Sequence, residues 1–448
     1  MSERFDVAIL GAGPAGEHAA YALVAEGRRV ALIERELIGG ECSNWACIPT
    51  KTLLRASEVR SESERAAGVQ PAALDWPGLA RYRDYMTSAG DDSNRVTSYE
   101  QMGVAVIKGV GRLAGPGRLA VGDRELEADS ILISTGSDPV IPPIEGLPEA
   151  GFWTNREATA MQHIPSSTVV IGGGPVGIEL AQFMRRFGSQ VALVQGAARL
   201  ADREDERVSE LLADSLRADG IEVRTSAHAQ RVETDGSERV LTLEDGSELR
   251  GERLIVAVGR RPRSAGIGLE TIGVEPGPRG IPADESCRVA DGVWAAGDCT
   301  GVMLFTHLAK YQARVALAGM RGRPATADYR AIPRVIFTDP EVAAVGLTEA
   351  QAVEQGLDVV VAKIELPGSI ARPYTYEQDP RGELSLVFDR ARRVMLGAWA
   401  VGPLASEWIH QAVLAIRAEV PLDVLRDTVA QFPSYSEAYL SALQALEL

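Results

Sequence analysis

Two cysteines that could do redox chemistry lie in Gly39–Lys51, which reads GGECSNWACIPTK. Four residues separate Cys42 from Cys47, so the spacing differs from the CxxC of zinc ribbons and thioredoxin-like sites. By itself it fits a redox-active and a structural disulfide about equally well. Pro49 is tolerated only in the first turn of a helix, which predicts a helix that begins near Cys47. The positive end of that helix would favour a thiolate at Cys47, so the stretch favours a reactive sulfur over a structural cross-link.

The composition limits the kind of protein in which this pair works. A length of 448 residues predicts about three domains. The chain is 45% hydrophobic and 24% charged, as in an ordinary globular protein, and no run approaches the roughly 18 apolar residues of a membrane span. The N-terminus lacks the features of a signal peptide, so we expect a cytoplasmic protein, in which a close cysteine pair is more often catalytic than structural. The net charge of −16 argues against nucleic-acid and membrane partners, and the isolated Cys287 and Cys299 are expected to be buried thiols.

The elements around the cysteines begin with a strand, a glycine turn and a helix. Asp6–Leu10 is followed by the GxGxxG of residues 11–16, by a helix expected over Glu17–Glu26, and by a second strand that ends at Glu34. Glycine-rich turns of this kind let a pyrophosphate approach the backbone at a helix N-terminus, and the acidic residue accepts hydrogen bonds from a ribose. In this context the motif predicts a dinucleotide site rather than a mere tight turn.

The same pattern recurs in the middle of the chain. Val169–Ile171 leads into the GxGxxG of residues 172–177, a helix follows, and Val191–Val194 closes the unit. The repeat predicts a second dinucleotide site.

The second unit differs from the first at the residue that follows its second strand. Gln195 stands there in place of an acid, and Gly196 follows. An acid would prefer the 2′-hydroxyl of NADH, whereas basic residues would favour NADPH. Arg199 and Arg203 are candidates for that basic role, and solvated surface charges are the competing interpretation. The nicotinamide preference stays open.

The remaining segments predict a discontinuous first domain and a separate C-terminal one. Val293–Asp298 reads as a buried strand that ends in a carboxylate, a position that usually binds ligand hydroxyls in such sheets, although Asp298 could instead cap the next helix. After Pro324 the pattern changes to strands and amphipathic helices without a phosphate loop. Strands are expected over residues 334–337, 359–364, 383–389 and 393–401, and helices over residues 407–418 and 422–430. We predict domains at 1–145 with 265–325, at 146–264 and at 326–448.

Together these features resemble the pyridine nucleotide-disulfide oxidoreductases, whose best-known members are dihydrolipoamide dehydrogenase, glutathione reductase and mercuric reductase. The resemblance covers nearly the whole chain, and the shorter motifs Ser134–Ser137, Gly259–Pro262, Ala296–Asp298 and Phe337–Pro340 stand in the family's order. It implies an α/β fold with two Rossmann-like dinucleotide-binding domains and a C-terminal α+β dimerisation domain. It also implies a homodimer in which the C-terminal segment reaches the partner's active site.

The resemblance implies FAD in the first unit and NADH or NADPH in the second. The residues that it places in the FAD site are Gly11, Gly13, Gly16, Glu34, Gly40, Lys51, Gly111, Thr135, Gly136, Asp298 and Thr306, and those around the nicotinamide nucleotide are Gly172, Gly174, Gly177, Gln195 and Gly259. It pairs Lys51 with Glu179 beside the flavin, where a lysine stabilises charge as hydride arrives. Glu179 is expected on the first turn of the second helix, where capping electrostatics alone would also favour a carboxylate. Pro175 replaces a tyrosine that covers the flavin in many members.

The C-terminus departs from the family pattern. Members that reduce disulfides carry His-Pro-Thr-x-x-Glu there, and the histidine is the acid and base for thiol exchange. This chain has Phe432 at the histidine position and keeps Glu437. General acid–base catalysis is worth about 10²–10⁴-fold, so ordinary thiol exchange would be severely handicapped. Tyr435 and Tyr439 are better explained as core or interface aromatics than as replacement acids, and no cysteine follows Cys299 to relay electrons.

The leading hypothesis is therefore a homodimeric FAD enzyme that passes electrons from NAD(P)H through Cys42–Cys47 to a small-molecule acceptor other than a standard disulfide. The alternatives are a disulfide or dihydrolipoamide oxidoreductase with another proton donor, a quinone or metal-ion reductase, and a flavin redox sensor without turnover. No resident metal is expected.

Overall fold

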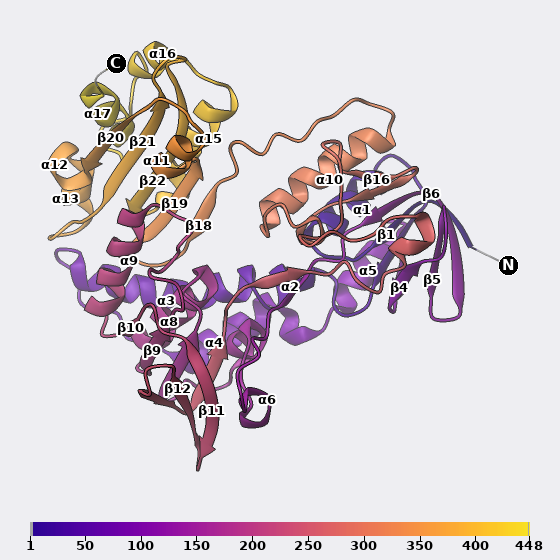
Figure 1. Ribbon diagram of the computed structural model, residues 1–448, viewed down its shortest axis with the longest axis horizontal. Coiled ribbons are helices and arrows are strands. Elements are labelled where there is room, and N and C mark those ends of the chain that lie inside the picture. The colour runs from indigo at the N-terminus through magenta and orange to yellow at the C-terminus, as the bar shows by residue number, and fades with distance from the viewer. Residues whose placement is uncertain (1–2, 447) are drawn as a thin grey trace. The chain divides into compact units, whose positions relative to one another are not determined.

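The computed structural model describes residues 3–446 and 448, which form two compact units (Figure 1). The first unit combines Met1–Thr50, Arg81–Val140 and Gly259–Asp328, and the second combines Lys51–Ala80, Ile141–Val258 and Tyr329–Leu448. Within the described residues, no helix is both long and apolar enough to cross a lipid bilayer.

The first unit is built on a mainly parallel sheet with the strand order β16-β17-β6-β1-β2-β3, to which β5 and β4 are added as antiparallel strands beside β6. The last four residues of β1 are all buried, as expected for a strand covered on both faces. The strands are β1 (Glu3–Leu10), β2 (Val30–Glu34), β3 (Ala105–Lys108), β4 (Gly111–Leu113), β5 (Arg118–Val121), β6 (Arg124–Ile133), β16 (Arg288–Ala290) and β17 (Val293–Ala295), and β7 (Ser137–Pro139) pairs with β15 (Arg260–Pro262).

Two alanine-rich helices pack together in this unit. Ala15 and Ala19 of α1 belong to the same buried cluster as Ala313 of α10, and such small side chains let two helices approach closely. Helix α1 begins at Pro14, three residues before the predicted start, because proline suits the first position of a helix. The helices of the unit are α1 (Pro14–Val24), α2 (Gly40–Asn44), α5 (Ser93–Gln101) and α10 (Thr306–Met320), with 3-10 turns η1 (Ser88–Gly90), η2 (Leu269–Ile272) and η3 (Asp298–Thr300); α3 (Cys47–Arg65) and α4 (Trp76–Met86) each contribute to both units.

The second unit contains a parallel sheet with the order β10-β9-β8-β14 and an antiparallel sheet β11-β12-β13. Their strands are β8 (Ser167–Ile171), β9 (Gln190–Val194), β10 (Glu222–Arg224), β11 (Ala229–Asp235), β12 (Glu238–Leu243), β13 (Glu248–Gly251) and β14 (Arg253–Val256). The helices are α6 (Leu147–Ala150), α7 (Asn155–Ala160), α8 (Pro175–Arg186) and α9 (Glu206–Ala218).

The C-terminal part of the same unit is an antiparallel sheet with the order β18-β19-β22-β21-β20. Its strands are β18 (Arg334–Ile336), β19 (Glu341–Gly346), β20 (Val359–Glu365), β21 (Glu383–Asp389) and β22 (Val394–Gly402), and its helices are α11 (Glu349–Glu354), α12 (Leu366–Ser369), α13 (Arg372–Tyr376), α14 (Ala405–Trp408), α15 (His410–Arg417), α16 (Leu422–Arg426) and α17 (Glu437–Ala445). The apolar faces of β22, α15 and α17 share one buried cluster. The sequence pattern did not reveal β19, and the helix expected over residues 407–418 is divided between α14 and α15.

Candidate active site

The segment that carries Cys42 packs directly on the first glycine-rich loop. The Gly39 amide donates to the Ala12 carbonyl oxygen at 2.8 Å, and a Cβ atom at Gly40 would lie 2.9 Å from the Gly13 Cα atom. Both Gly39 and Gly40 have positive φ angles, of 98° and 56°. The two glycines are therefore needed for this close approach, which brings the cysteine segment to the predicted pyrophosphate site.

The two thiols differ in their surroundings. Helix α3 begins at Cys47 and places Pro49 in its first turn, as predicted. The Cys47 sulfur lies 3.4 Å from the Thr306 hydroxyl oxygen at the start of α10. A hydrogen bond to Cys47, reinforced by burial, raises the pKa of the Cys42 thiol. Because two neighbouring thiolates would repel each other, Cys42 keeps its proton.

The first glycine loop fits a dinucleotide. A Cβ atom at Gly11 would lie 2.3 Å from the Ser134 carbonyl oxygen, and one at Gly16 would lie 2.0 Å from the Gly11 carbonyl oxygen, so both glycines are required for strand and helix packing. A Cβ atom at Gly13 would meet nothing within 4 Å. Gly13 precedes the N-terminus of α1, so the open space beside it suits a pyrophosphate. The buried Glu34 carboxylate accepts from the Ala12 amide at 2.8 Å, beside the same loop.

Asp298 is held at the end of β17 by a chain of polar contacts. The Ser137 hydroxyl donates to its carboxylate at 2.6 Å, the Arg260 Nε donates to Ser137 at 2.8 Å, and the Arg260 guanidinium lies 3.4 Å from the Glu41 carboxylate. Burial raises the pKa of Asp298, and the hydrogen bond from Ser137 opposes this rise. Asp298 is the first residue of the 3-10 turn η3, and α10 begins eight residues later, at Thr306. The alternative that Asp298 caps that helix is therefore wrong.

Three other residues predicted at the FAD site have definite positions in the first unit. The Thr135 hydroxyl donates to the Arg263 carbonyl oxygen at 2.6 Å, and the Gly136 carbonyl oxygen accepts from the Arg263 amide at 2.9 Å. Gly111 starts β4, and a Cβ atom there would lie 2.6 Å from Leu10 and 2.8 Å from Ile33. The surroundings of Gly111 therefore explain the glycine by packing in the core.

The second glycine loop repeats the first. A Cβ atom at Gly172 would lie 2.3 Å from the Ala257 carbonyl oxygen, one at Gly177 would lie 1.9 Å from the Gly172 carbonyl oxygen, and one at Gly174 would meet nothing within 4 Å. Gln195 accepts from the Gly173 amide at 2.9 Å. The loop therefore fits a second dinucleotide.

Of the two basic residues near Gln195, Arg199 is less available to a nucleotide than the sequence suggested. One nitrogen of Arg199 donates to the Glu204 carbonyl oxygen at 2.8 Å and to the Ser209 hydroxyl at 3.1 Å, whereas Arg203 is exposed. The contacts of Arg199 favour a structural role. Gly259, which follows the strand β14, has a φ of 128° and accepts from the Val140 amide at 2.9 Å in the first unit.

Lys51 and Glu179 form the predicted ion pair. The Lys51 ammonium lies 2.6 Å from one oxygen of Glu179, and the other oxygen accepts from the Phe337 amide at 3.0 Å. The Glu179 side chain is 4% exposed and that of Lys51 is 35% exposed, so the carboxylate is the fixed partner. Helix α8 begins at Pro175, which puts Glu179 in the second turn, so the expected position in the first turn is wrong.

The C-terminal segment contains a surface phenylalanine and buried tyrosines. Phe432 is 68% exposed. Glu437 is the first residue of α17, and its carboxylate accepts from the Ser434 amide at 3.0 Å in the segment that precedes the helix. Tyr435 is stacked on Trp408, and burial raises the pKa of both Tyr435 and Tyr439. The tyrosines are therefore core aromatics, as the sequence favoured.

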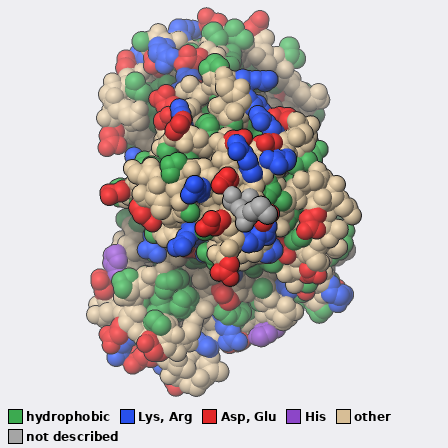
Figure 2. Space-filling view, turned by 90° about the vertical axis from the view of Figure 1, so that its right-hand side faces the viewer, with side chains coloured by type: hydrophobic (Ala, Val, Ile, Leu, Met, Phe, Trp, Pro, Cys, Tyr) green, Lys and Arg blue, Asp and Glu red, His purple; other side chains and the backbone are tan. Residues whose placement is uncertain are grey.

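The surface charge is mixed in sign. Figure 2 shows acidic and basic side chains interspersed over the face that it presents. With a net charge of −16, an anionic ligand has to be held by local donors such as the amides of the glycine loops.

The sequence and the fold are similar to those of known redox proteins. Residues 5–313 match the family model of the pyridine nucleotide-disulphide oxidoreductases, and residues 332–443 match that of their dimerisation domain. A mercuric reductase of Streptomyces lividans is 34% identical over 98% of this chain and 96% of the relative, and a dihydrolipoyl dehydrogenase of Bacillus subtilis (strain 168) is 31% identical over 98% and 97%. A solved Cu(II) complex of the HOCl-induced flavoprotein disulfide reductase RclA from Escherichia coli has a TM-score of 0.88 at 29% identity, with all of both chains covered. These matches confirm the predicted α/β class with a C-terminal dimerisation domain.

Proposed function

Because the chain belongs to the pyridine nucleotide-disulphide oxidoreductases, we propose that it passes electrons from NAD(P)H through a Cys42–Cys47 disulfide to a small-molecule acceptor other than a standard disulfide. The enzyme is an FAD flavoprotein that uses NAD(P)H, as its relatives are. One feature supports the choice of acceptor: the chain keeps both cysteines and the Lys51–Glu179 pair, but it has Phe432 at the position where the family resemblance implies the acid–base histidine of disulfide reductases.

The cysteine chemistry balances in two steps. Bound FAD supplies the chemistry that takes a hydride from NAD(P)H and makes two electrons available to the disulfide. Two electrons and one proton break the Cys42–Cys47 bond and leave a Cys42 thiol with a Cys47 thiolate, in agreement with the raised pKa of Cys42. When the acceptor takes two electrons, the disulfide forms again and the proton of Cys42 is released. Lys51, fixed by Glu179, provides a positive charge next to the reaction.

A quinone or a metal ion suits a site without the histidine. A quinone takes up two electrons and two protons from water and the thiol, and a metal ion takes electrons and needs no protonated leaving group. The similarity to mercuric reductases and to a Cu(II)-bound flavoprotein supports the metal ion as one class to test. In our proposal a metal ion would be handled by Cys42 and Cys47 themselves.

The dimerisation domain supports a homodimer. In our proposal the C-terminal segment with Phe432 and Glu437 reaches the partner's active site, so that an exposed aromatic ring replaces an imidazole beside Cys42 of the other subunit. We assign the enzyme to the cytoplasm, where a reducing environment keeps such a pair available for turnover. We also propose that the chain divides into the three predicted domains, at 1–145 with 265–325, at 146–264 and at 326–448.

A panel of acceptors tests the proposal. NADH or NADPH consumption is measured with lipoamide, glutathione disulfide, a quinone, Hg(II) and Cu(II), for the wild type and for Cys42→Ser and Cys47→Ser. We expect turnover with a quinone or a metal ion that falls at least about 10²-fold in both variants. Fastest turnover with a disulfide would contradict the proposal, and consumption that stops after one equivalent would identify a redox sensor instead.

Phe432→His tests the acceptor argument separately. If the missing histidine limits thiol exchange, the variant should gain about 10²-fold or more in disulfide reduction, and its rate with a quinone should stay the same. Phe432→Leu is the matched control, because it changes the ring without adding a proton carrier. Equal disulfide reduction in the two variants would contradict the argument.

A further inference from the structure

Phe337 contacts both members of the Lys51–Glu179 pair. Its amide donates to the Glu179 oxygen that does not face Lys51, at 3.0 Å, and the Lys51 ammonium lies 4.6 Å from the centre of its ring. Each carboxylate oxygen of Glu179 therefore has one partner. The position of the Lys51 ammonium depends on where the Phe337 backbone lies.

The segment from Phe337 to Asp339 is bound along one face of α8. Glu179, Gln182 and Arg186 follow one another at intervals of three and four residues, so their side chains point the same way. Gln182 accepts from the Asp339 amide at 2.9 Å and donates to the Asp339 carbonyl oxygen at 3.0 Å, and Arg186 donates to the Asp339 carboxylate at 3.0 Å. The helix thus holds the segment at both ends.

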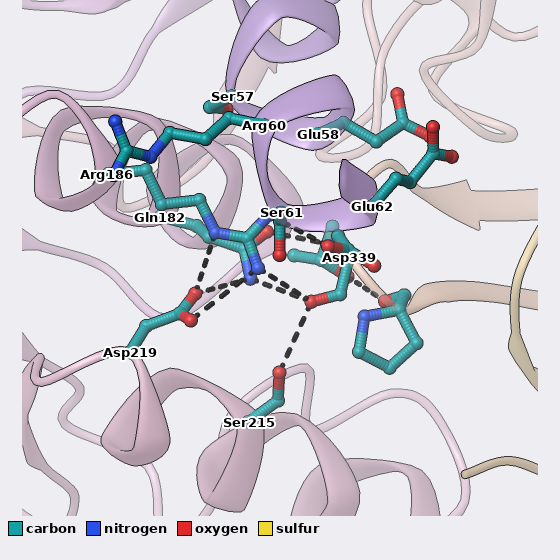
Figure 3. A network of polar contacts seen from close by, with 12 residues as sticks. Ser57, Glu58, Arg60, Ser61, Glu62, Gln182, Arg186, Ser215, Asp219 and Asp339 are labelled. Carbon is teal, nitrogen blue, oxygen red and sulfur yellow. Dashed lines mark hydrogen bonds and ion pairs between the residues drawn. The ribbon is translucent and has the colours of Figure 1, made fainter. Parts of the chain in front are cut away.

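The Asp339 carboxylate also binds α3, the helix that carries Lys51. Arg65, the last residue of α3, donates to both carboxylate oxygens, at 2.9 and 2.8 Å. Figure 3 shows Asp339 among residues of α3 and α8, with the Arg186 side chain between Asp339 and Asp219. The side chains of Asp339 and Arg186 are 11% and 12% exposed, so these contacts are largely shielded from water. Helix α3 is therefore bonded to this network near both of its ends: Lys51 pairs with Glu179 of α8, and Arg65 pairs with Asp339.

We propose that Asp339 is a positioning residue for the reductive step: it fixes the Phe337 amide against Glu179 and so holds the Lys51 ammonium in place. The inference rests on the proposed role of Lys51 beside the flavin. A competing interpretation is a buried ion cluster that only stabilises the fold. Asp219 can distinguish these two interpretations. It binds the same Arg186 and Gln182, at 3.0 and 2.9 Å, but no hydrogen bond joins it to Phe337 or to the Asp339 carboxylate within the part of the chain that the structure describes.

The test compares Asp339→Asn with Asp219→Asn in the FAD-loaded enzyme. The first readout is hydrogen–deuterium exchange of the Phe337 amide, and the second is the rate at which NADH or NADPH bleaches the flavin absorbance in stopped flow. Asp339→Asn should speed exchange at Phe337 by about tenfold and slow bleaching by about 10- to 100-fold, with the dependence on nucleotide concentration unchanged. Asp219→Asn should lower the unfolding temperature and leave both readouts as in the wild type.

Two results would overturn the inference. One is that both variants lose stability while neither changes exchange at Phe337, and the other is faster exchange in Asp339→Asn with an unchanged bleaching rate. If Asp339→Asn does not fold, Arg65→Gln replaces it, because Asp339 then keeps Arg186 and loses its two hydrogen bonds from Arg65, although Arg65→Gln also breaks the ion pair of Arg65 with Glu377. Smaller changes in the same two readouts are expected, and their absence would equally overturn the inference. Lys51→Met tests the proposed role of Lys51 separately from that of Asp339. If Lys51→Met does not slow bleaching, the role assigned to Lys51 is wrong. If Lys51→Met slows bleaching and Asp339→Asn does not, only the role of Asp339 is wrong.

Discussion

The two glycine-rich loops have the same backbone conformation and differ in the residue at the C-terminal end of the second strand, which is Glu34 in the first unit and Gln195, one residue past β9, in the second. Gly11 and Gly172 have φ angles of 109° and 118°, and a Cβ atom at either would lie 2.3 Å from a carbonyl oxygen of a neighbouring strand or loop. Glu34 and Gln195 stand at the same offset and each accepts from a loop amide, at 2.8 and 2.9 Å.

The difference between them is one of charge. Glu34 has a second carboxylate oxygen that accepts from the Glu36 amide at 2.7 Å, whereas Gln195 offers a neutral amide. A glutamine therefore keeps the contact that orders the loop and removes the negative charge that a ribose would meet. The backbone of each loop fits a dinucleotide, and we propose that the residue at this offset contributes to which nucleotide is accepted.

The largest effects are expected where the two loops are most alike. Gly11→Ala and Gly172→Ala each force a methyl group against a carbonyl oxygen at a positive φ, so each should cost about 4 kcal/mol of unfolding free energy. Gly11→Ala should lose FAD during purification. Gly172→Ala should retain FAD that dithionite reduces and NAD(P)H does not.

Gly27→Ala and Gly188→Ala are matched controls for this pair. These glycines also have positive φ angles, of 76° and 100°, but a Cβ atom at either meets nothing within 4 Å. They should cost only about 1–2 kcal/mol and leave both ligands bound. If Gly172→Ala released FAD as readily as Gly11→Ala, the assignment of one nucleotide to each loop would be wrong.

Acid should distinguish carboxylates of the two units, because their pKa values are displaced in opposite directions. Burial raises the pKa of Asp298. Burial acts the same way on Asp339, but Arg186 and Arg65 outweigh it and hold the pKa of that carboxyl below its usual range. The stabilisation from Asp339 is therefore present above the ordinary aspartate pKa of about 3.9 and is lost as the pH falls through the lower folded value.

Asp339→Asn should accordingly cost about 3 kcal/mol of unfolding free energy near pH 7, since it leaves two largely buried arginines with one carboxylate partner each, Asp219 for Arg186 and Glu377 for Arg65, and the cost should shrink toward pH 3. Urea unfolding between pH 3 and 7 measures it. Asp214→Asn is the control, because the side chain of Asp214 is 74% exposed and its ion pair with Arg217 spans 3.5 Å. A cost that does not change with pH would show that the charge of Asp339 is unimportant.

A smaller effect is expected at the third position of each loop. Gly13 and Gly174 have φ angles of −77° and −87°, which any residue adopts, and a Cβ atom at either meets nothing within 4 Å. Alanine should therefore leave the unfolding temperature unchanged. It should weaken the cognate nucleotide by about 10- to 30-fold, or roughly 2 kcal/mol, by crowding the pyrophosphate. Calorimetric titration measures the loss, and a lower unfolding temperature would contradict the view that these two glycines serve the ligand.

The sequence was informative where the signal is local. The two GxGxxG motifs, the acid at Glu34 and the start of α3 at Cys47 all follow from residues that are close in the chain. The turn assigned to Glu179 was wrong because Pro175 was counted as part of the loop, although proline favours the first position of a helix. The same reasoning had placed Pro49 correctly.

The contacts that support the site could not be predicted from the sequence. The Phe337 amide lies 158 residues from Glu179 in the chain, and a bond from a backbone amide leaves no trace in residue type. Asp339 and Arg65 are separated by 274 residues, and neither belongs to a motif for ion pairing. Strand β19 was missed because its alanine-rich sequence has no strong strand propensity, and it is defined by pairing with β18 and β22 on both sides.

Gln195→Glu gives the smallest effect and tests the comparison most directly. The substitution restores in the second loop the acid of the first, and its carboxylate can keep the contact to the Gly173 amide, so the fold should not change. A negative charge beside the adenine ribose repels a 2′-phosphate and accepts from a 2′-hydroxyl, so the ratio of kcat/KM for NADH to that for NADPH should rise about tenfold, or roughly 1.4 kcal/mol.

Arg203→Ala is the companion variant, because Arg203 is exposed whereas Arg199 is engaged by Glu204 and Ser209. A change in the ratio with Arg203→Ala and none with Gln195→Glu would assign the preference to the basic side chain and would show that the two loops differ in more than the residue after the strand.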